Sequence, residues 1–327
     1  MSTSLQRPMD RSDEDIRVSI LIVSFNTRDL TIACLRSIVT EADGTNFEVL
    51  FIDNGSSDDS AESVDREFKD DPRFHILASK GNLGFAAANN ELAKAAKGEY
   101  VLLLNPDTVV LDHAIDRLVE FAERTPENGI WGGRTVFADG SLNPTSCWGP
   151  FTLWSELCAS FGLRAAFSRS TLFHPRGYGS WQRDSVREVG VVTGCFFLMK
   201  LKDWNRFGGF DPEFFMYGEE TDLCMRAIKR GMKPVITPTA TIIHYGGASE
   251  KIHEEKMVRL LDAQVRLFRR HFSKVTFFLM FFSMQVGVLL RSAITGTRNR
   301  LRGRAAANDW SRLWKRRLEW CRGARER

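Results

Sequence analysis

Polar side chains that could bind a ligand follow three short apolar runs of the chain. The runs and their polar neighbours are Val18–Ser24 with Asn26, Phe47–Ile52 with Asp53, and Tyr100–Leu104 with Asn105 and Asp107. Asn105 and Asp107 are two residues apart, so in an extended chain their side chains share one face and can approach the same ion. Because these ligands are oxygen atoms rather than thiolates, they favour Mg²⁺ or Mn²⁺, whose natural partner is a phosphate group.

Further candidate residues lie in the second half of the chain. Glu219 and Glu220 precede a predicted helix, where a carboxylate could accept a proton, and His244 follows the apolar run Thr-Ile-Ile. An acid in the first turn also stabilises a helix through its dipole, so both interpretations of Glu219 stay open. Taken alone, a histidine such as His244 is more often simply exposed or hydrogen-bonded than a ligand.

The familiar phosphate-binding loops are absent from the sequence. It contains neither GxxxxGK[ST] nor GxGxxG, which argues against a P-loop kinase and against a dinucleotide-dependent dehydrogenase. Instead, the segment Lys80–Asn90 (KGNLGFAAANN) combines a glycine turn with the start of a predicted helix. Its backbone amides, or the side chain of Asn82, could contact a nucleotide.

The apolar runs are predicted to be strands of a mainly parallel sheet. A further run covers residues 74–77, and helix-like segments at about 29–39, 60–68 and 85–96 alternate with the runs. This alternation is typical of an α/β fold in which helices cover both faces of the sheet. Ligands of such sheets bind at the carboxyl ends of the strands, which is where the polar residues stand.

The middle of the chain is less regular. Gly, Pro and aromatic residues are scattered through residues 131–188, which are therefore predicted to be loops and short helices that shape an acceptor surface. A strand is expected over Val189–Met199, and the segment Gly208–Arg226 is expected to lead into a helix.

Six short motifs follow one another in a particular order. They are Ser-Phe-Asn, Asp-Asn-Gly-Ser-Ser-Asp, Gly-Asn-Leu-Gly-Phe-Ala-Ala-Ala-Asn, Asn-Pro-Asp, Gly-Phe-Asp-Pro-Glu-Phe-Phe-Met-Tyr-Gly-Glu-Glu-Thr-Asp-Leu-Cys-Met-Arg and His-Tyr-Gly-Gly-Ala-Ser. In content and order they resemble the family 2 glycosyltransferases, and the last two resemble the bacterial rhamnosyltransferase-like branch. The resemblance covers about residues 17–250. It implies a GT-A fold, a nucleoside-diphosphate sugar donor, a divalent metal (Mg²⁺ or Mn²⁺) and inversion at the anomeric carbon.

The resemblance also implies which residues contact the donor. Those expected to bind the nucleotide sugar are Ser24, Asn26, Asp53, Asn82 and Asn105. Among them, Asp53 would bond to the pyrimidine, and Asn105 would lie near the ribose or the metal. Asp107 would bind the metal, and His244 would complete the metal or diphosphate site.

Two positions depart from the family's pattern. Asn105 stands where the family commonly has the first Asp of Asp-X-Asp, which leaves Asp107 as the one carboxylate of the pair. Glu220 stands where the family has the Asp that acts as general base, so the base is one methylene longer, with Glu219 as the fallback. A single carboxylate is compatible with metal binding, because water and the donor's phosphate oxygens can complete the coordination. A glutamate can also serve as the base if its backbone lies slightly farther back.

The expected reaction is transfer of a sugar in cell-envelope or exopolysaccharide synthesis. The resemblance favours rhamnose from dTDP-rhamnose, within a dTDP or UDP type of donor, and a glycan or lipid-linked acceptor. The alternative is a non-catalytic nucleotide-sugar-binding module on the membrane, which would need Asp53 and Asp107 but not the Glu219–Glu220 pair. Release of nucleoside diphosphate separates the two.

The C-terminal residues differ in charge from the rest of the 327-residue chain. Residues 251–327 carry 19 Lys and Arg against 6 Asp and Glu, whereas residues 1–250 carry 26 against 35. Apolar residues spaced by three and four at 258–272 predict a basic amphipathic helix, and it leads into 16 uncharged residues at 275–290. That stretch is short for a span, so a re-entrant or interfacial helix is favoured. Three tryptophans among arginines follow at 310–320, as expected at an anionic headgroup layer.

These features predict three regions: a flexible polar tail at 1–15, a GT-A domain at 16–250, and a membrane-association region at 251–327. The tail lacks the apolar core of a secretion signal, and the six cysteines form no CxxC pair, so reduced thiols and a cytosolic setting are expected. The enzyme would lie at the cytoplasmic face of the inner membrane, peripheral or monotopic. Nucleic-acid binding is disfavoured, because the basic charges accompany an apolar stretch.

Overall fold

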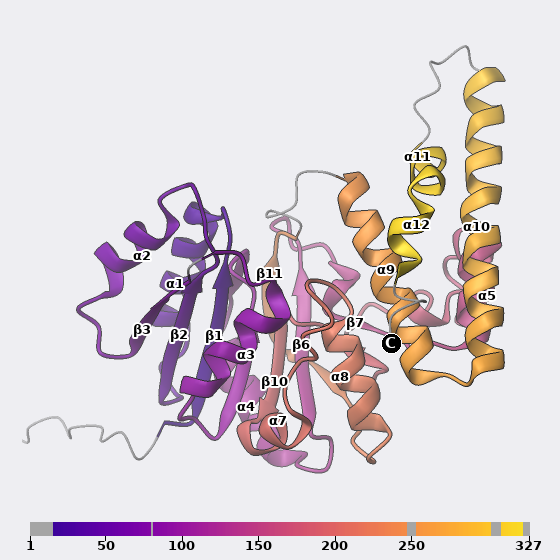
Figure 1. The fold of residues 1–327 in the computed structure, drawn as a ribbon. Coiled ribbons are helices and arrows are strands. Elements are labelled where there is room, and N and C mark those ends of the chain that lie inside the picture. Colours follow the sequence, from indigo (N-terminus) through magenta and orange to yellow (C-terminus); the bar gives the residue numbers. More distant parts are fainter. Residues whose placement is uncertain (1–15, 80, 247–252, 302–308, 323–327) are drawn as a thin grey trace, which may run out of the picture.

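The structure is a computed structural model that describes residues 16–79, 81–246, 253–301 and 309–322 (Figure 1). A large mixed sheet occupies the left and centre of Figure 1, and the C-terminal helices stand beside it on the right. The predicted polar tail at 1–15 and the predicted boundary at 250 lie outside the described residues.

The main sheet has nine strands within the described residues, in the order β3-β2-β1-β4-β10-β6-β11-β5, with β8 beside β11. The strands are β1 Val18–Ser24, β2 Phe47–Asp53, β3 Phe74–Ala78, β4 Tyr100–Leu104, β5 Thr108–Val110, β6 Ile130–Val136, β8 Arg187–Glu188, β10 Phe196–Lys200 and β11 Val235–His244. β1 pairs in parallel with β2 and β4, and β2 with β3, whereas β10 runs antiparallel to β4 and β6. The predicted α/β fold with a mainly parallel sheet is confirmed.

Helices cover both faces of the sheet. One face carries α1 Arg28–Glu41, α2 Ser60–Phe68 and α4 Ala114–Arg124, and the other carries α3 Phe85–Ala95, α7 Leu201–Phe207 and α8 Glu219–Ile228. A separate buried cluster lies on each face, one around Phe51 and Leu35 and the other around Phe197 and Leu92. Because β1 is buried along its whole length, its apolar residues do not alternate with polar ones but form the run Ile20–Val23, which faces both sides of the sheet.

The prediction of loops and short helices over residues 131–188 is wrong for β6, which lies at the centre of the sheet. The segment reads as a loop because it contains two consecutive glycines, yet the packing requires them. A Cβ on Gly133 would lie 2.3 Å from the carbonyl oxygen of Ala240 in the neighbouring strand. The short helices α5 Leu153–Ser160 and α6 Leu163–Ala166 in the same segment agree with the prediction.

The single strand predicted over Val189–Met199 is two strands in the structure. β9 (Val191–Val192) pairs with β7 (Cys147–Trp148) in a separate small sheet, and β10 begins only at Phe196. The turn at 193–195 separates them, so this segment leaves one sheet and enters the other.

The predicted amphipathic helix is α9 (His253–His271), but it covers protein rather than lipid. Its apolar residues Val258, Leu261, Val265 and Phe268 are at most 7% exposed. They belong to a buried cluster that includes Phe151 and Phe214, which come from the preceding part of the chain.

The arginines of α9 also face protein. Arg266 and Arg269 pair with Glu213 at 2.9 and 2.6 Å, and Arg270 pairs with Asp211 and Asp222. The basic charge of this helix is therefore largely neutralised within the molecule. Of the region predicted to associate with a membrane, α9 packs as an integral part of the sheet-bearing body.

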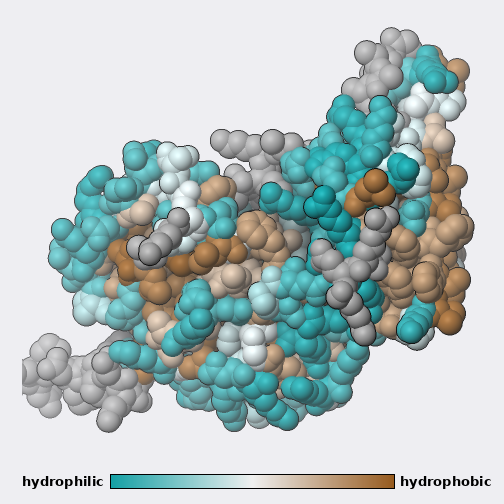
Figure 2. Space-filling view, viewed as in Figure 1, coloured by the Kyte–Doolittle hydropathy of each residue, from teal (hydrophilic) through white to brown (hydrophobic). Residues whose placement is uncertain are grey.

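The apolar run predicted at 275–290 lies within α10 (Lys274–Leu301), a helix of 28 residues. By length and composition alone, α10 could cross a membrane, although part of it is buried inside the molecule. One side packs against α5 and α9, with Met280, Met284 and Val288 buried. The other side exposes large apolar residues, seen as the brown surface along the right edge of Figure 2.

Of the three tryptophans expected at a headgroup layer, Trp320 is buried, and Trp310 and Trp314 are partly buried against the same cluster. They lie on α11 (Asp309–Lys315) and α12 (Arg317–Trp320), which pack beside α9 and α10. Trp320 is fully buried, and its indole N–H donates to the carbonyl of Leu313 at 2.9 Å. Trp320 therefore belongs to the protein core, contrary to the expectation from sequence.

Candidate active site

The loops that follow β1 and β2 are joined by hydrogen bonds from Asn26. Its backbone N–H donates to Oγ of Ser56 at 2.8 Å, and its side-chain oxygen accepts from the backbone N–H of Ser57 at 2.8 Å. Asn26 has a φ of 53°, a left-handed conformation that asparagine tolerates better than most residues. Asn26 thus holds together two of the loops at the carboxyl edge of the sheet.

A third loop, at residues 81–84, is fixed through Asn54. Nδ2 of Asn54 donates to Oδ1 of Asn82 at 3.1 Å, and the backbone N–H of Leu83 donates to Oδ1 of Asn54 at 2.8 Å. Oδ1 of Asn82 also accepts from the backbone N–H of Gly84 at 2.9 Å. The side chain of Asn82 is exposed, and its Nδ2 is the group left to donate to a ligand.

Ser24 lies beneath these loops rather than at their surface. Its side chain is fully buried, and its Oγ is 3.0 Å from Oγ1 of Thr31 and 3.2 Å from Oγ1 of Thr27. Its carbonyl accepts from the backbone N–H of Asn54 at 2.8 Å. Ser24 therefore anchors the start of α1 and the loop after β2, and its hydroxyl does not face the site.

Asp53 has one carboxylate oxygen that the protein does not use. Oδ2 accepts from the backbone N–H of Ser56 at 2.9 Å, whereas Oδ1 is buried and has no hydrogen-bond partner. A buried acceptor without a partner is unfavourable, so Oδ1 is suited to accept a hydrogen bond from a ligand.

Asn105, Asp107 and His244 converge at the same edge of the sheet, where β4 lies next to β1. Nε2 of His244 lies 3.4 Å from Oδ1 of Asp107 and 3.4 Å from Nδ2 of Asn105. The antiparallel pairing of β5 with β11 sets Thr108 opposite His244, and the N–H of Tyr245 donates to the carbonyl of Asp107 at 3.0 Å. Residues far apart in the sequence are thus brought together, as their positions at strand ends predict.

The surroundings of Asp107 favour a positive charge. Burial on its own would lower the pKa of His244, but the Cys195 sulfur and the Asp107 carboxylate outweigh burial and raise that pKa to about 10. Asp107 is itself only 6% exposed. A nearly buried carboxylate beside a ring nitrogen is a donor set that fits a divalent cation, which on binding displaces the proton from the ring, because only the neutral imidazole is a ligand.

Two residues that sequence reasoning missed hold His244 in place. Nδ2 of Asn143 donates to the carbonyl of His244 at 2.8 Å, and Oγ1 of Thr145 lies 3.4 Å from Nδ1 of the ring. Because Nδ1 of the ring faces Thr145, Nε2 faces Asp107. No motif in the irregular middle of the chain indicated this role.

Asn90 and Gly84 position the loop that leads to α8. Asn90 donates to the carbonyl of Phe210 at 2.8 Å and accepts from its N–H at 2.9 Å. Gly84 has a φ of +78°, and a Cβ there would lie 2.4 Å from the carbonyl oxygen of Phe215. The loop at 210–218 is thereby held against the start of α3, close to Asn82.

Glu219 and Glu220 form the first turn of α8, and each has a buried Oε2 without a hydrogen-bond partner. Burial raises the pKa of Glu219 well above its usual value, and the neighbouring Glu220 raises it further. Burial also raises the pKa of Glu220, but Arg176 opposes that rise. Glu219 is only 4% exposed and Glu220 is half-buried, so Glu220 is the more accessible of the two.

α8 is connected to the His244 group through β9. The thiol of Cys224 lies 3.8 Å from the carbonyl oxygen of Val192, and the turn after Val192 carries Cys195, which interacts with His244. The helix that carries Glu219 and Glu220 thus packs against the segment that leads to Cys195 and the His244 group.

Arg176 is a further charged residue near Glu220 that sequence reasoning missed. Its guanidinium carbon lies 3.4 Å from the ring centre of Phe151, and its Nη1 is buried without a hydrogen-bond partner. Burial lowers the pKa of Arg176 to about 10, so the group remains charged at neutral pH. No motif marked it, because it lies in the single 3₁₀ turn Pro175–Gly177 within the irregular middle of the chain.

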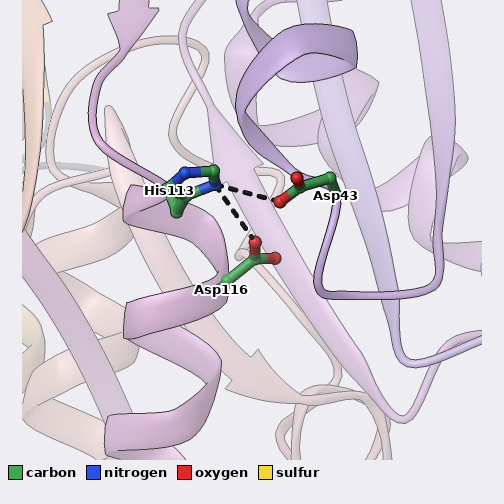
Figure 3. A group of neighbouring side chains, drawn as sticks. All are labelled: Asp43, His113 and Asp116. Atoms are coloured by element: carbon green, nitrogen blue, oxygen red, sulfur yellow. Dashed lines mark ion pairs between the residues drawn. The ribbon is translucent and has the colours of Figure 1, made fainter.

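Another cluster, Asp43, His113 and Asp116, lies at the far end of α1 (Figure 3). Nδ1 of His113 is 3.0 Å from Oδ1 of Asp43 and 3.9 Å from Oδ2 of Asp116. His113 and Asp43 are exposed, and the cluster contains none of the residues predicted to bind a metal. Ion pairing between the ring and the two carboxylates accounts for the arrangement.

Comparison of the sequence with known proteins finds relatives of this chain. The L-rhamnosyltransferase of Mycobacterium tuberculosis that acts on N-acetylglucosaminyl-diphospho-decaprenol is 29% identical over 216 residues, 60% of this chain and 66% of that protein. The rhamnosyltransferase WbbL of Escherichia coli is 27% identical over 179 residues, 51% of this chain and 62% of that protein. Each match spans less than two-thirds of the relative's length.

Solved structures show a similar fold. The mannosyltransferase PcManGT of Pyrobaculum calidifontis, in complex with GDP-mannose and Mn²⁺, superposes with a TM-score of 0.55 at 15% identity, over 98% of this chain and 90% of that one. Residues 19–194 match the family described as Glycosyl transferase family 2. This chain therefore belongs to glycosyl transferase family 2 and is a glycosyltransferase with a GT-A fold.

Proposed function

We propose that the enzyme transfers a sugar, with inversion, from a nucleoside diphosphate to a lipid-linked acceptor. The observation that carries the proposal is the convergence of Asn105, Asp107 and His244 beside loops that present the unpaired Oδ1 of Asp53. The relatives named as rhamnosyltransferases favour dTDP-rhamnose as donor. The acceptor class follows the diphospho-decaprenol in the name of the mycobacterial relative.

On this proposal, Asp53 Oδ1 accepts an N–H of the pyrimidine, and Nδ2 of Asn82 donates to the nucleotide. Asp107 and His244 would hold a divalent cation, which stabilises the nucleoside diphosphate as a leaving group when bound. Asn105 orients the ring of His244 or contacts the ribose. The Mn²⁺ in the structure of the mannosyltransferase supports this choice of cation.

The same proposal makes Glu220 the general base. Its carboxylate takes the proton of the acceptor hydroxyl as that oxygen attacks the anomeric carbon from the face opposite the leaving group. Burial raises the pKa of Glu220, which makes its carboxylate a stronger base. Glu219 is more deeply buried and is the alternative if Glu220 does not reach the acceptor.

We further propose that α10, rather than the whole of residues 251–327, attaches the enzyme to the cytoplasmic face of the inner membrane. Its outer side exposes Val275, Phe278 and Phe282 by 64–71%. Large apolar side chains on one side of a helix are typical of helices that lie in the interface. α9 is excluded from this role because its apolar residues are covered by protein.

The experiment is a donor screen with the purified full-length chain. Release of nucleoside diphosphate is measured for dTDP-rhamnose, UDP-galactose, UDP-glucose and GDP-mannose, with Mn²⁺ or with EDTA, in the presence of an N-acetylglucosaminyl diphospho-lipid. We expect release from dTDP-rhamnose that requires both the cation and the acceptor. Donor binding without release under every condition would instead support the non-catalytic nucleotide-sugar-binding module.

A further inference from the structure

The guanidinium of Arg176 is available to a ligand that the protein itself does not supply. It stacks on Phe151, and its Nη1 is buried with no hydrogen-bond partner. Its backbone is fixed separately, because the carbonyl of Arg176 accepts from the N–H of Gly149 at 2.8 Å. A cation held firmly in place with an unused donor is the arrangement expected of an anion-binding residue.

The neighbourhood of Arg176 contains more positive than negative charge. The buried carboxylate of Glu156 accepts from Oγ of Ser160 at 2.8 Å and lies close enough to Arg164, Arg176 and Arg291 for each to affect its ionisation. Three guanidinium groups thus surround one carboxylate. Even when the charge of Glu220 is added, a net positive charge remains, and it favours an anion.

This positive region lies between the proposed base and α5, the helix that packs on the buried side of α10. The helix that carries Glu156, α5, packs directly on α10, where a Cβ on Gly287 would lie 2.8 Å from Cα of Ser160. Beyond Ser160 the chain exposes Phe161, Phe167 and Leu172 by 50–59%. An acceptor whose lipid lies on these apolar residues would reach Glu220 by passing Arg176.

We propose that Arg176 binds the diphosphate of a lipid-linked acceptor and so positions the acceptor sugar at Glu220. This inference rests on the proposed function, because it names the acceptor group that the same site recognises. The contact is a charge-assisted hydrogen bond from Nη1 to a phosphate oxygen, and stacking on Phe151 fixes the orientation of the guanidinium. The donor diphosphate is recognised separately, at Asp107 and His244.

The test compares two acceptors that differ only in the diphosphate. One is N-acetylglucosaminyl diphosphate on a short prenyl chain, and the other is the alkyl N-acetylglucosaminide that carries the same chain without the diphosphate. Arg176→Gln is expected to raise KM for the first acceptor about 10- to 100-fold, the effect of one charge-assisted hydrogen bond. We expect KM for the alkyl acceptor and for the donor to stay within about twofold. Arg176→Lys should recover part of the loss, because it restores the charge without the planar donor group.

Arg169→Gln is the matched control, since Arg169 is exposed on the same segment and its removal changes the charge equally. We expect it to leave both KM values unchanged. Equal losses for the two acceptors with Arg176→Gln would mean that Arg176 only supports the fold, and would overturn the inference. An unchanged KM for the diphosphate acceptor, or a raised KM for the donor, would also overturn it.

A binding measurement separates failure of this inference from failure of the proposed function. The prenyl diphosphate alone is titrated into wild-type protein and into Arg176→Gln, without any donor. At least tenfold weaker binding by the variant supports the inference, even if no donor is ever used by the wild type. If the wild type transfers sugar but binds the prenyl diphosphate no better than Arg176→Gln does, the inference is wrong and the proposed function stands.

Discussion

Nε2 of His271, the last residue of α9, lies 2.8 Å from Oδ1 of Asp222 in the first turn of α8, and both side chains are buried. Oδ2 of the same carboxylate pairs at 2.6 Å with Arg226, four residues farther along the same helix. Asp222 follows Glu220 by two residues. The C-terminal helix α9 is therefore bonded to the helix that carries the proposed base.

This bond predicts that a chain ending at residue 250 will not fold stably. Loss of α9 uncovers Phe151 and Phe214 and removes two partners of Asp222, Arg270 and His271. Each large apolar side chain that becomes exposed costs about 1.5–3 kcal/mol, so the loss approaches the stability of a whole domain. Soluble yield and thermal unfolding of the shortened chain test this. His271→Gln in the full chain, expected to lower the Tm by a few degrees, isolates the ion pair. A shortened chain that melts with the full-length Tm would show that the two parts are independent.

Asp107→Asn is expected to reduce transfer by at least about 100-fold, because it removes the carboxylate from the proposed cation site while keeping the size of the side chain. Asn105→Ala removes only a contact of an uncharged side chain with His244, so we expect it to reduce transfer by about tenfold or less. The measurement is kcat/KM over a range of Mn²⁺ concentrations. Activity of Asp107→Asn equal to wild type at saturating Mn²⁺ would remove Asp107 from the metal site.

Glu220→Gln is expected to lower kcat by roughly 100-fold or more and to leave donor affinity unchanged, since the amide keeps the shape but cannot take a proton. Glu219→Gln serves as the comparison, because its carboxyl is the more deeply buried and is expected to retain activity. Single-turnover rates and donor binding are measured for both variants. The opposite ranking would assign the base to Glu219.

Regular elements were predictable where burial imposes a repeating pattern. β4 spans the predicted Tyr100–Leu104 and α2 the predicted residues 60–68, because each is defined by side chains buried against the sheet. β6 was not predictable, because its two glycines are required by the close approach of β11, and glycine in a sequence otherwise indicates a loop.

The candidate site was predictable at the strand ends but not in the loops. Asp107 and His244 meet because β5 and β11 pair, and both stand at the ends of apolar runs. Arg176 and Asn143 belong to irregular segments whose position only the folded chain determines. The apolar face of α9 could also be predicted only in part. Its spacing indicates that it packs on an apolar partner but does not show whether that partner is lipid or protein.

Glu156→Gln is expected to change how stability depends on pH. Burial raises the pKa of Glu156 to about 7, above its usual value of 4.5, so the folded state binds the proton more tightly than the unfolded chain does. Wild-type stability should therefore fall as the pH rises from about 4.5 to about 7, by on the order of 3 kcal/mol from this group. Glu156→Gln does not lose stability in this way. The difference in unfolding free energy, variant minus wild type, should therefore be larger at pH 8 than at pH 4.5. A difference that is the same at both pH values would contradict the raised pKa.

Replacing Phe278 and Phe282 together by serine is expected to release the enzyme from membranes. The two rings are 64% and 67% exposed, so their loss leaves the packing of α10 intact. Each ring that enters the bilayer contributes roughly 1.5–3 kcal/mol, and an apolar contribution persists in high salt, where attraction between charges is screened. Wild-type protein should therefore sediment with vesicles in high salt and be released by detergent, whereas the double variant should stay in solution.

Phe137→Ser is the matched control, because Phe137 is 41% exposed next to β6, away from α10, and should leave sedimentation unchanged. Wild-type protein that remains in solution at low salt without detergent would rule out α10 as a membrane anchor and indicate that its apolar side binds another protein.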